Sequence, residues 1–199
     1  VGGLDGALES RTVSTALITS FEDERPAAAI TWRKLSQAAQ QTIEAGAGLT
    51  GSLGEFNWQV LSPHLGASEA EDSNDASVTM LFTSPSLVLI GLADLGERGQ
   101  MRLASESTGW LGDGFGDVPV VVKVAHHGSR DQYPELYEHL RPKVALFSSG
   151  QGNEYGHPTD RTLAIVRSAG AAVFRTDLQG SIALAASSEG LQAHVSGRG

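Results

Sequence analysis

The sequence has no cysteine among its 199 residues. This absence excludes a disulfide-stabilised scaffold, a thiolate zinc site and an enzyme with a cysteine nucleophile. Long apolar runs are also missing: residues such as Thr79, Pro85 and Asp94 interrupt the longest apolar region, 78–95, so no transmembrane span is predicted. The first residues lack the basic segment followed by an apolar one that marks a signal peptide, and none is predicted.

Several motifs of nucleotide-binding and hydrolytic enzymes are absent as well. The chain has no G-x-x-x-x-G-K-[ST] loop, no G-x-S-x-G nucleophile elbow and no H-E-x-x-H zinc motif. Its glycine-rich segments at 112–116 and 150–152 do not match the G-x-G-x-x-G fingerprint of dinucleotide-binding proteins. These absences disfavour the corresponding nucleotide-binding folds and the serine hydrolases of the α/β-hydrolase class.

Basic residues are few, with 14 Lys and Arg against 23 Asp and Glu, and the formal net charge is −9. The imbalance belongs to the first part of the chain, because residues 1–119 hold 6 basic and 16 acidic side chains, whereas residues 120–199 hold 8 and 7. We therefore expect no attraction of the whole surface to nucleic acid. A local basic or metal-bearing site in the second part is compatible with this charge.

Hydrophobic periodicity predicts strands and helices that alternate along the second half. The expected strands are 13–19, 56–60, 77–83, 87–90, 118–124, 144–148, 172–175, 181–185 and 191–195; the expected helices are 32–45, 96–104, 134–140 and 159–168. Segments 64–76 and 105–117 are predicted loops. The pattern predicts a layered α/β or α+β fold. Since no linker or repeat divides the chain, residues 1–199 are expected to form a single domain.

Polar side chains suited to metal chemistry follow three of the predicted strands. Asp94 follows the strand 87–90, His126 and His127 follow the apolar strand 118–124, and His157 follows the strand 144–148. Because loops at one edge of a layered fold converge, we expect these side chains to share one site. Carboxylate and neutral imidazole are ligands of Zn and Mn, and together they are typical of metal hydrolases. Taken singly, each residue is also explained as a helix N-cap or a solvated turn residue.

Two further segments have polar residues near turns. In the segment 153–158, His157 precedes a proline that opens a predicted helix, and a helix N-terminus favours an anion such as phosphate. Thr176 and Asp177, followed by Gly180, are also explained as a hairpin turn. The remaining histidines have no such context and are expected to be surface or packing residues: His64, His139 and His194.

These segments, in this order and spacing, resemble the metallo-β-lactamase-fold domain at the C-terminus of ComEC-type DNA-internalisation (competence) proteins. The resemblance covers residues 74–184 and is weaker over residues 1–62. It depends on Asn-Asp at 74–75, Asp94 before Glu97 and Gln100, His-His-Gly-Ser at 126–129, Asn-x-Tyr-Gly-His-Pro at 153–158 and Thr-Asp-x-x-Gly at 176–180.

The resemblance implies an αββα sandwich with a divalent metal site, Zn or Mn, at one edge. It implies a metal-dependent phosphodiesterase or nuclease that acts on single-stranded DNA or another phosphodiester. It also implies a larger parent, a bacterial membrane protein whose channel lies N-terminal to this domain, with the domain itself soluble and on the extracytoplasmic side. The oligomeric state is left open.

The resemblance further implies roles for individual residues. Asp94 would bridge two metal ions, His126 and His127 are the candidate imidazole ligands, and His157 would contact the phosphate or assist the leaving oxygen. Residues that would support these groups or contact phosphate are Ser129, Asn153, Thr176 and Asp177, and Asp177 is a candidate for orienting a histidine.

Two departures separate the chain from the family pattern. Family members carry an H-x-D-x-D-H or H-x-H-x-D-H ligand motif just before a G-G-L segment; residues 1–4 match the latter, but the motif is not in this sequence. The fold is therefore expected to lack N-terminal strands, and one metal position to lose most of its donors. In addition, Ala93 replaces the usual glycine before Asp94, where it adds a Cβ.

Other functions therefore stay open. One alternative is a non-catalytic module of the same fold that binds a partner or nucleic acid. Another is a hydrolase of a small ester or phosphodiester, because one fold hosts many chemistries. Activity of this piece on its own is also left open.

Overall fold

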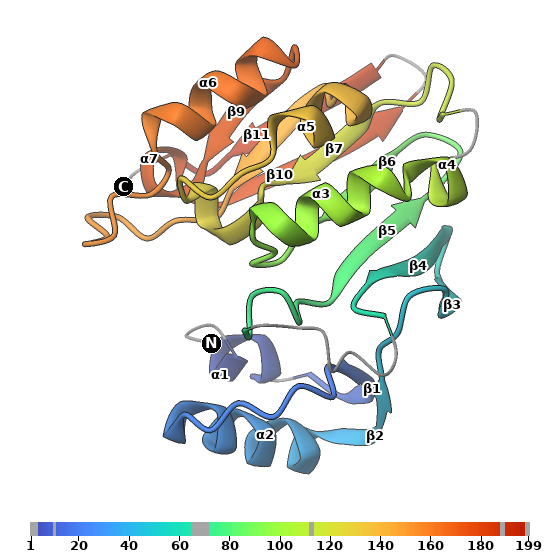
Figure 1. Ribbon diagram of the computed structural model, residues 1–199, viewed down its shortest axis with the longest axis vertical. Helices are drawn as coiled ribbons and strands as arrows, with labels where there is room; N and C mark the ends of the chain where they lie inside the picture. Colours follow the sequence, from blue (N-terminus) through green and yellow to red (C-terminus); the bar gives the residue numbers. More distant parts are fainter. Residues whose placement is uncertain (1–3, 10, 65–71, 112–113, 188–189, 198–199) are drawn as a thin grey trace.

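A computed structural model describes residues 4–9, 11–64, 72–111, 114–187 and 190–197 (Figure 1). Its largest element is a seven-stranded mixed sheet with the strand order β3-β4-β5-β6-β7-β8-β9. The strands are β3 (Thr50–Leu53), β4 (Phe56–Ser62), β5 (Thr79–Thr83), β6 (Val88–Gly91), β7 (Val120–Lys123), β8 (Val144–Phe147) and β9 (Ala172–Arg175). Neighbours from β3 to β6 are antiparallel, and neighbours from β6 to β9 are parallel.

The parallel half of the sheet needs crossover connections, and helices supply them. The crossover helices are α3 (Glu97–Ser105), α4 (Ser107–Trp110), α5 (Pro134–Leu140) and α6 (Asp160–Ser168), and the short helix α7 (Thr176–Gln179) follows β9. In Figure 1, α3, α5 and α6 lie side by side over one face of the sheet. Local sequence explains their starts: Pro134 occupies the first turn of α5, and the side chain of Thr159 caps α6 by accepting a hydrogen bond from the backbone N–H of Thr162.

The hydrophobic core lies between these helices and the sheet. Alternate strand residues such as Ile90, Val122 and Phe147 are fully buried against helix residues such as Leu136 and Val166. Burying each such side chain stabilises the fold by roughly 1.5–3 kcal/mol. The core therefore holds β6, β7 and β8 firmly, together with the loops that leave their carboxyl ends.

The remaining elements form two smaller sheets. β1 (Val13–Ile18) and β2 (Ala39–Glu44) are parallel and are joined through α2 (Pro26–Ala38), whereas β10 (Ile182–Ser187) and β11 (Gly190–Val195) are antiparallel. Together with α1 (Leu4–Leu8), the β1–α2–β2 unit lies at the opposite end of the molecule from α6 (Figure 1). No helix in the described residues combines the length and the apolar character that crossing a membrane requires.

The prediction of a mixed α/β fold is confirmed, and most predicted elements match within a few residues. The helix predicted at 32–45 is wrong in extent, because α2 begins at Pro26 and residues 39–44 form β2. The backbone of Ile43 pairs with that of Leu17 on β1, and this long-range strand pairing outweighs the helical spacing of the apolar residues. The predicted loop 105–117 contains α4, and residues 176–179 form α7 rather than a hairpin turn. Part of the predicted loop 64–76 lies outside the described residues, as do residues 1–3.

Candidate functional site

Three loops leave the sheet at the same edge, because β6, β7 and β8 are parallel neighbours. Asp94 lies on the loop after β6, His126 and His127 on the loop after β7, and His157 on the connection from β8 to α6. The Oδ1 atom of Asp94 is 3.6 Å from Nε2 of His127. The ring centroids of His126 and His157 are 5.8 Å apart, and those of His126 and His127 are 6.4 Å apart. The four residues predicted to share a site therefore lie together.

The backbone of this site is unusual. Four non-glycine residues of the described structure have positive φ, and three of them are Ala93, His126 and His127. Each such conformation costs about 1–3 kcal/mol and persists only where surrounding contacts impose it. One of these contacts joins two of the loops, because the backbone N–H of His126 donates to the carbonyl of Ala93 at 2.9 Å. Strain of this kind is typical of functional loops.

Gly128 allows the histidine loop to pack tightly. Its φ is +84°, and a Cβ placed on it would lie 2.6 Å from atoms of both Phe147 and Pro158. Its carbonyl accepts a hydrogen bond from the backbone N–H of Thr159 at 2.9 Å, which joins the loop to the start of α6. The loop after β7 is therefore held against the connection that carries His157.

A buried polar side chain supports both ends of the histidine loop. The side-chain amide nitrogen of Gln132 donates to the carbonyls of Ala125 (3.1 Å) and Ser129 (3.2 Å), and its oxygen accepts from the hydroxyl of Tyr137 at 2.5 Å. Gln132 and Tyr137 are fully buried. Burial raises the pKa of the Tyr137 hydroxyl, so this group stays protonated as a donor. Sequence reasoning missed Gln132; the signal that could have found it is a glutamine just beyond the histidine motif.

Gln100 extends this support to α3. Its amide nitrogen donates to the carbonyls of Leu95 and Asp131, and its oxygen accepts from the backbone N–H of Tyr133. Like Gln132, it is fully buried. Because buried amides are stable only when they are hydrogen-bonded, these two glutamines specify one conformation for the loops around the site.

The backbone just after β8 orients the ring of His127. Its Nδ1 atom is 2.6 Å from the carbonyl oxygen of Ser148, which identifies Nδ1 as the protonated nitrogen and leaves Nε2 facing Asp94. The ammonium of Lys123 lies 3.9 Å from Oδ1 of Asp94 and donates to the carbonyl of Ala93 at 2.9 Å. Burial lowers the pKa of Lys123, whereas the nearby Asp94 carboxylate acts in the opposite direction.

His126 and His157 differ from His127 in their partners. The Nδ1 atom of His126 is buried and has no hydrogen-bond partner in the described part of the chain. Such an orphaned nitrogen is rare in native proteins and is typical of a strained site, a bound water or a bound ion. Desolvation lowers the pKa of His157, and the neighbouring His126 and His127 lower it further, so the His157 imidazole is neutral at pH 7.

The four predicted supporting residues make different contacts in the structure. The amide of Asn153 donates to the carbonyl of His157 (2.7 Å) and accepts from its N–H (3.0 Å), which fixes that loop. The hydroxyl of Thr176 bonds both the N–H and the carbonyl of Ser149. Ser129 is buried, and its hydroxyl accepts from the backbone N–H of Asp131.

Asp177 is the fourth of these residues. Its carboxylate forms a two-pronged ion pair with the guanidinium of Arg175, with an Arg175 Nε–Asp177 Oδ1 distance of 3.0 Å. This contact raises the pKa of Arg175. Direct contacts of these four residues with phosphate, and the orientation of a histidine by Asp177, stay predictions.

The donor chemistry of the site suits a divalent cation, but the number of donors is small. Catalytic zinc sites use three protein ligands. Among the residues that the structure describes, no three His, Asp or Glu side chains are grouped so that they could hold one ion. Asp94 and His127 approach each other, and the buried Nδ1 of His126 has no hydrogen-bond partner in the described residues. That these residues ligate a metal ion stays a prediction.

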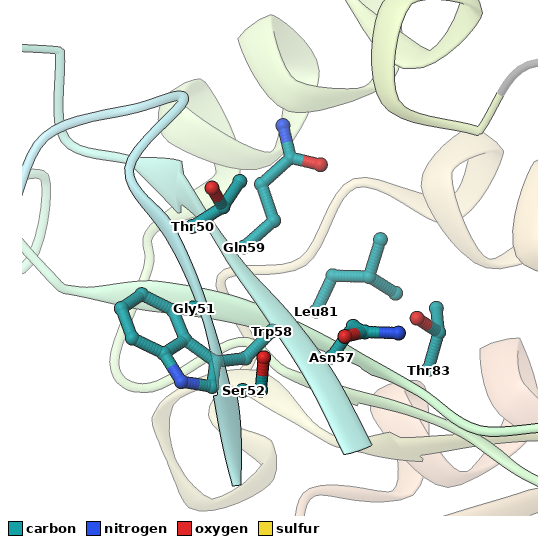
Figure 2. Close-up of a pocket in the computed structure, with 8 residues that line it drawn as sticks. All are labelled: Thr50, Gly51, Ser52, Asn57, Trp58, Gln59, Leu81 and Thr83. Atoms are coloured by element: carbon teal, nitrogen blue, oxygen red, sulfur yellow. The ribbon is translucent and has the colours of Figure 1, made fainter. Parts of the chain in front are cut away.

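Two pockets lie outside this cluster. One, of about 370 Å³, lies on β3, β4 and β5 and has no charged residue in its lining (Figure 2). Figure 2 shows Trp58 beside Gly51, with Gln59, Asn57 and Thr83 on neighbouring positions. The other, of about 410 Å³, lies beside the start of α3, and its acidic lining would repel phosphate: Asp72, Asp75, Glu97 and Asp131. Neither pocket contains the histidines predicted to act.

The fold and site thus describe a mixed α/β protein with an aspartate and three histidines at the carboxyl ends of parallel strands. Two curated proteins are similar to part of the chain. ComE operon protein 3 of Bacillus subtilis (strain 168) is 29% identical over 129 residues, which cover 64% of this chain and 16% of that protein. Competence protein ComA of Neisseria gonorrhoeae is 30% identical over 112 residues, which cover 56% of this chain and 15% of that protein.

These similarities are distant and partial. The aligned segments cover about a sixth of the length of either relative. No family model matches the sequence, and no solved structure matches it. Part of the chain is therefore distantly similar to competence proteins.

Proposed function

We propose that this chain is a phosphodiester-hydrolysing domain of a DNA-uptake system, acting on single-stranded DNA or a related phosphodiester. The observation that supports it best is the grouping of Asp94, His126, His127 and His157 at one sheet edge on strained backbone. Aspartate with several imidazoles is the composition of metal hydrolases rather than of serine or cysteine enzymes. The partial similarity to competence proteins supports DNA as the substrate.

A divalent ion, Zn or Mn, belongs to this proposal. Asp94, His126 and His127 would be its ligands from this chain, and further ligands would have to come from outside the described residues. When bound, such an ion supplies Lewis-acid polarisation of a phosphoryl oxygen and activation of water. Because the described donors are too few to hold an ion alone, we derive no step through it.

The chain's own residues have definable tasks. The Ser148 carbonyl accepts a hydrogen bond from Nδ1 of His127 and so holds the ring with Nε2 facing Asp94. His157, neutral at pH 7 because its pKa is lowered, can accept a proton from a reacting group or donate a hydrogen bond to a phosphate oxygen. The Lys123 ammonium offsets the negative charge of Asp94, which would otherwise repel an anionic substrate.

We also propose that the fold is of the metallo-β-lactamase type, an αββα sandwich. Residues on the sheet face opposite the helices, such as Phe82, Leu89 and Leu146, are only half-buried, which leaves room for a second layer. Along β10, half-buried and exposed residues alternate, as one-sided packing requires. The much greater length of both relatives supports a longer parent protein. That this parent contains a membrane channel, with this domain on the extracytoplasmic side, is part of the proposal and rests on the resemblance of the motifs alone.

Cleavage of DNA by the full chain tests this function. We expect end-labelled single-stranded DNA to be cut when Mn²⁺ or Zn²⁺ is added, and not in the presence of EDTA. Asp94→Asn and His127→Ala should each lower the rate by about 100-fold or more, because each removes a metal donor. The matched control is His139→Ala, which removes an exposed histidine on α5 and should leave the rate unchanged.

The same assay distinguishes the alternatives. Absence of cleavage with either metal would contradict the hydrolase and favour a non-catalytic binding module. Cleavage of a small phosphodiester without cleavage of DNA would favour a small-molecule hydrolase. Equal loss in His139→Ala would indicate a general effect on folding.

A further inference from the structure

Tyr155 is the most exposed large aromatic or aliphatic side chain in the described structure, at 85% relative exposure. It lies on the connection from β8 to α6, two residues before His157. Its ring stacks on that of His157, with centroids 5.9 Å apart and an interplanar angle of 28°. An aromatic ring held beside a site, with most of its surface in water, is available for another planar group.

The loop that carries Tyr155 is held in place although its side chain is exposed. The Asn153 amide bonds both backbone groups of His157 and also donates to the carbonyl of Gly150 at 3.1 Å. The backbone of Gly156 donates to the carbonyl of Asn153 at 3.4 Å. Residues 150–157 therefore form a closed turn, so little ordering is needed when a ligand stacks on the ring.

The position of Tyr155 relates it to the histidine cluster. The ring of His157 neighbours both that of Tyr155 and that of His126, with centroid distances of 5.9 Å and 5.8 Å. In a nucleotide, one sugar links the base to its phosphate. A phosphate at the His126–His157 end of the cluster therefore leaves its base within reach of Tyr155.

We propose that Tyr155 is a base-stacking platform, which makes the site a subsite for one unpaired nucleobase of a single-stranded nucleic acid. In a duplex, both faces of a base are covered by its neighbours, whereas an unpaired base can stack on an aromatic side chain. The ring selects for a base without reading its identity, because every base has a π-face. This inference deepens the proposed function, since it assigns a residue to the recognition of the substrate.

Binding without cleavage tests the platform. Fluorescence anisotropy in EDTA would measure the affinity of the full chain for a labelled oligothymidylate of about twelve nucleotides. An abasic phosphodiester of the same length and charge would report backbone contacts alone. The variants are Tyr155→Ala, Tyr155→Phe, which keeps the ring, and Leu178→Ala, which truncates an exposed side chain on α7 as a control.

We expect wild type to prefer the oligothymidylate over the abasic strand. Tyr155→Ala should weaken oligothymidylate binding by about tenfold or more, with little effect on the abasic strand. Tyr155→Phe and Leu178→Ala should stay within about twofold of wild type. A Tyr155→Ala affinity equal to wild type, an equal loss for both strands, or no preference for bases in wild type would overturn the inference.

The result is separable from that of the cleavage assay. Tyr155-dependent binding of bases without any cleavage would support the base-stacking role of Tyr155 and contradict the proposed hydrolase. Cleavage that depends on Asp94 but not on Tyr155, with equal binding of both strands, would support the hydrolase and contradict the base-stacking role of Tyr155.

Discussion

His157 illustrates how neighbouring residues set the chemistry of a single side chain. Desolvation and the adjacent His126 and His127 all disfavour its imidazolium form, so its pKa falls below the ordinary 6.5. Asn153 holds its backbone from both sides. A neutral imidazole in a fixed position can accept a proton at neutral pH, which a histidine in a mobile exposed loop does less well.

This property is measurable in the metal-free protein. An NMR titration of the ring protons should show a midpoint for His157 below 6.5, and His126→Ala should raise it. Because the unfolded chain binds this proton first, the free energy of unfolding should fall as the pH is lowered from the unfolded pKa to the folded one. A midpoint at or above 6.5 would contradict the structure.

Gln132 carries the residue-scale argument for stability. Gln132→Leu removes both donors to the histidine loop and takes this partner from the Tyr137 hydroxyl and the Ala125 carbonyl, whereas the Ser129 carbonyl keeps its bond from the Thr162 hydroxyl. Each buried group left unpaired costs about 1–3 kcal/mol, so urea unfolding should show a loss of at least about 2 kcal/mol. Gln37→Leu, at an exposed position on α2, should change stability little. A similar loss of stability in both variants would indicate that the hydrogen bonds of Gln132 do not account for the loss.

At the scale of elements, the loop after β7 connects the others. It is bonded to the loop after β6 through Ala93 and to the start of α6 through Gly128. Because a strand's end is fixed by the core behind it, the three loops keep their spacing as one unit. The positions of Asp94 and His157 therefore depend on the packing of Gly128 as well as on their own loops.

Gly128→Ala tests this dependence. The added Cβ would lie 2.6 Å from Phe147 and Pro158, and φ is +84°. Overpacking and backbone strain together should lower the free energy of unfolding by about 2 kcal/mol or more. Gly150→Ala adds a Cβ that meets no atom within 4 Å and should be nearly neutral. Urea unfolding of both variants measures the difference. Equal free energies of unfolding for Gly128→Ala and Gly150→Ala would contradict this dependence.

Sequence patterns predicted the strands that end at the site because each is a short, apolar segment followed by a polar residue. They also predicted that Asp94, His126, His127 and His157 would lie together, which follows from parallel strands ending at one edge. They did not predict the hydrogen bonds from Gln132 to the histidine loop or the bond of His127 to Ser148, because such contacts depend on tertiary packing. The boundary of α2 was misplaced for the same reason: β2 exists only through its pairing with β1.

At the scale of the whole molecule, two regions differ in how much of their surface is buried in a hydrophobic core. The seven-stranded sheet and the helices over it share a continuous core, whereas α2 has no buried residue and β2 is largely exposed. The charge does not follow this division, because residues 1–44 hold 4 basic and 6 acidic side chains, whereas residues 45–119 hold 2 and 10. The candidate site belongs mainly to the well-packed region, where pre-organised groups are best maintained.

The central claim is that one site unites the three loops, and paramagnetic broadening by Mn²⁺ tests it most directly. The ring-proton NMR signals of all six histidines would be followed as Mn²⁺ is added to the full chain. The account predicts that the signals of His126, His127 and His157 broaden first and together, and that Asp94→Asn delays this broadening. Broadening that begins at His139 or His194, or that is unchanged by Asp94→Asn, would contradict it.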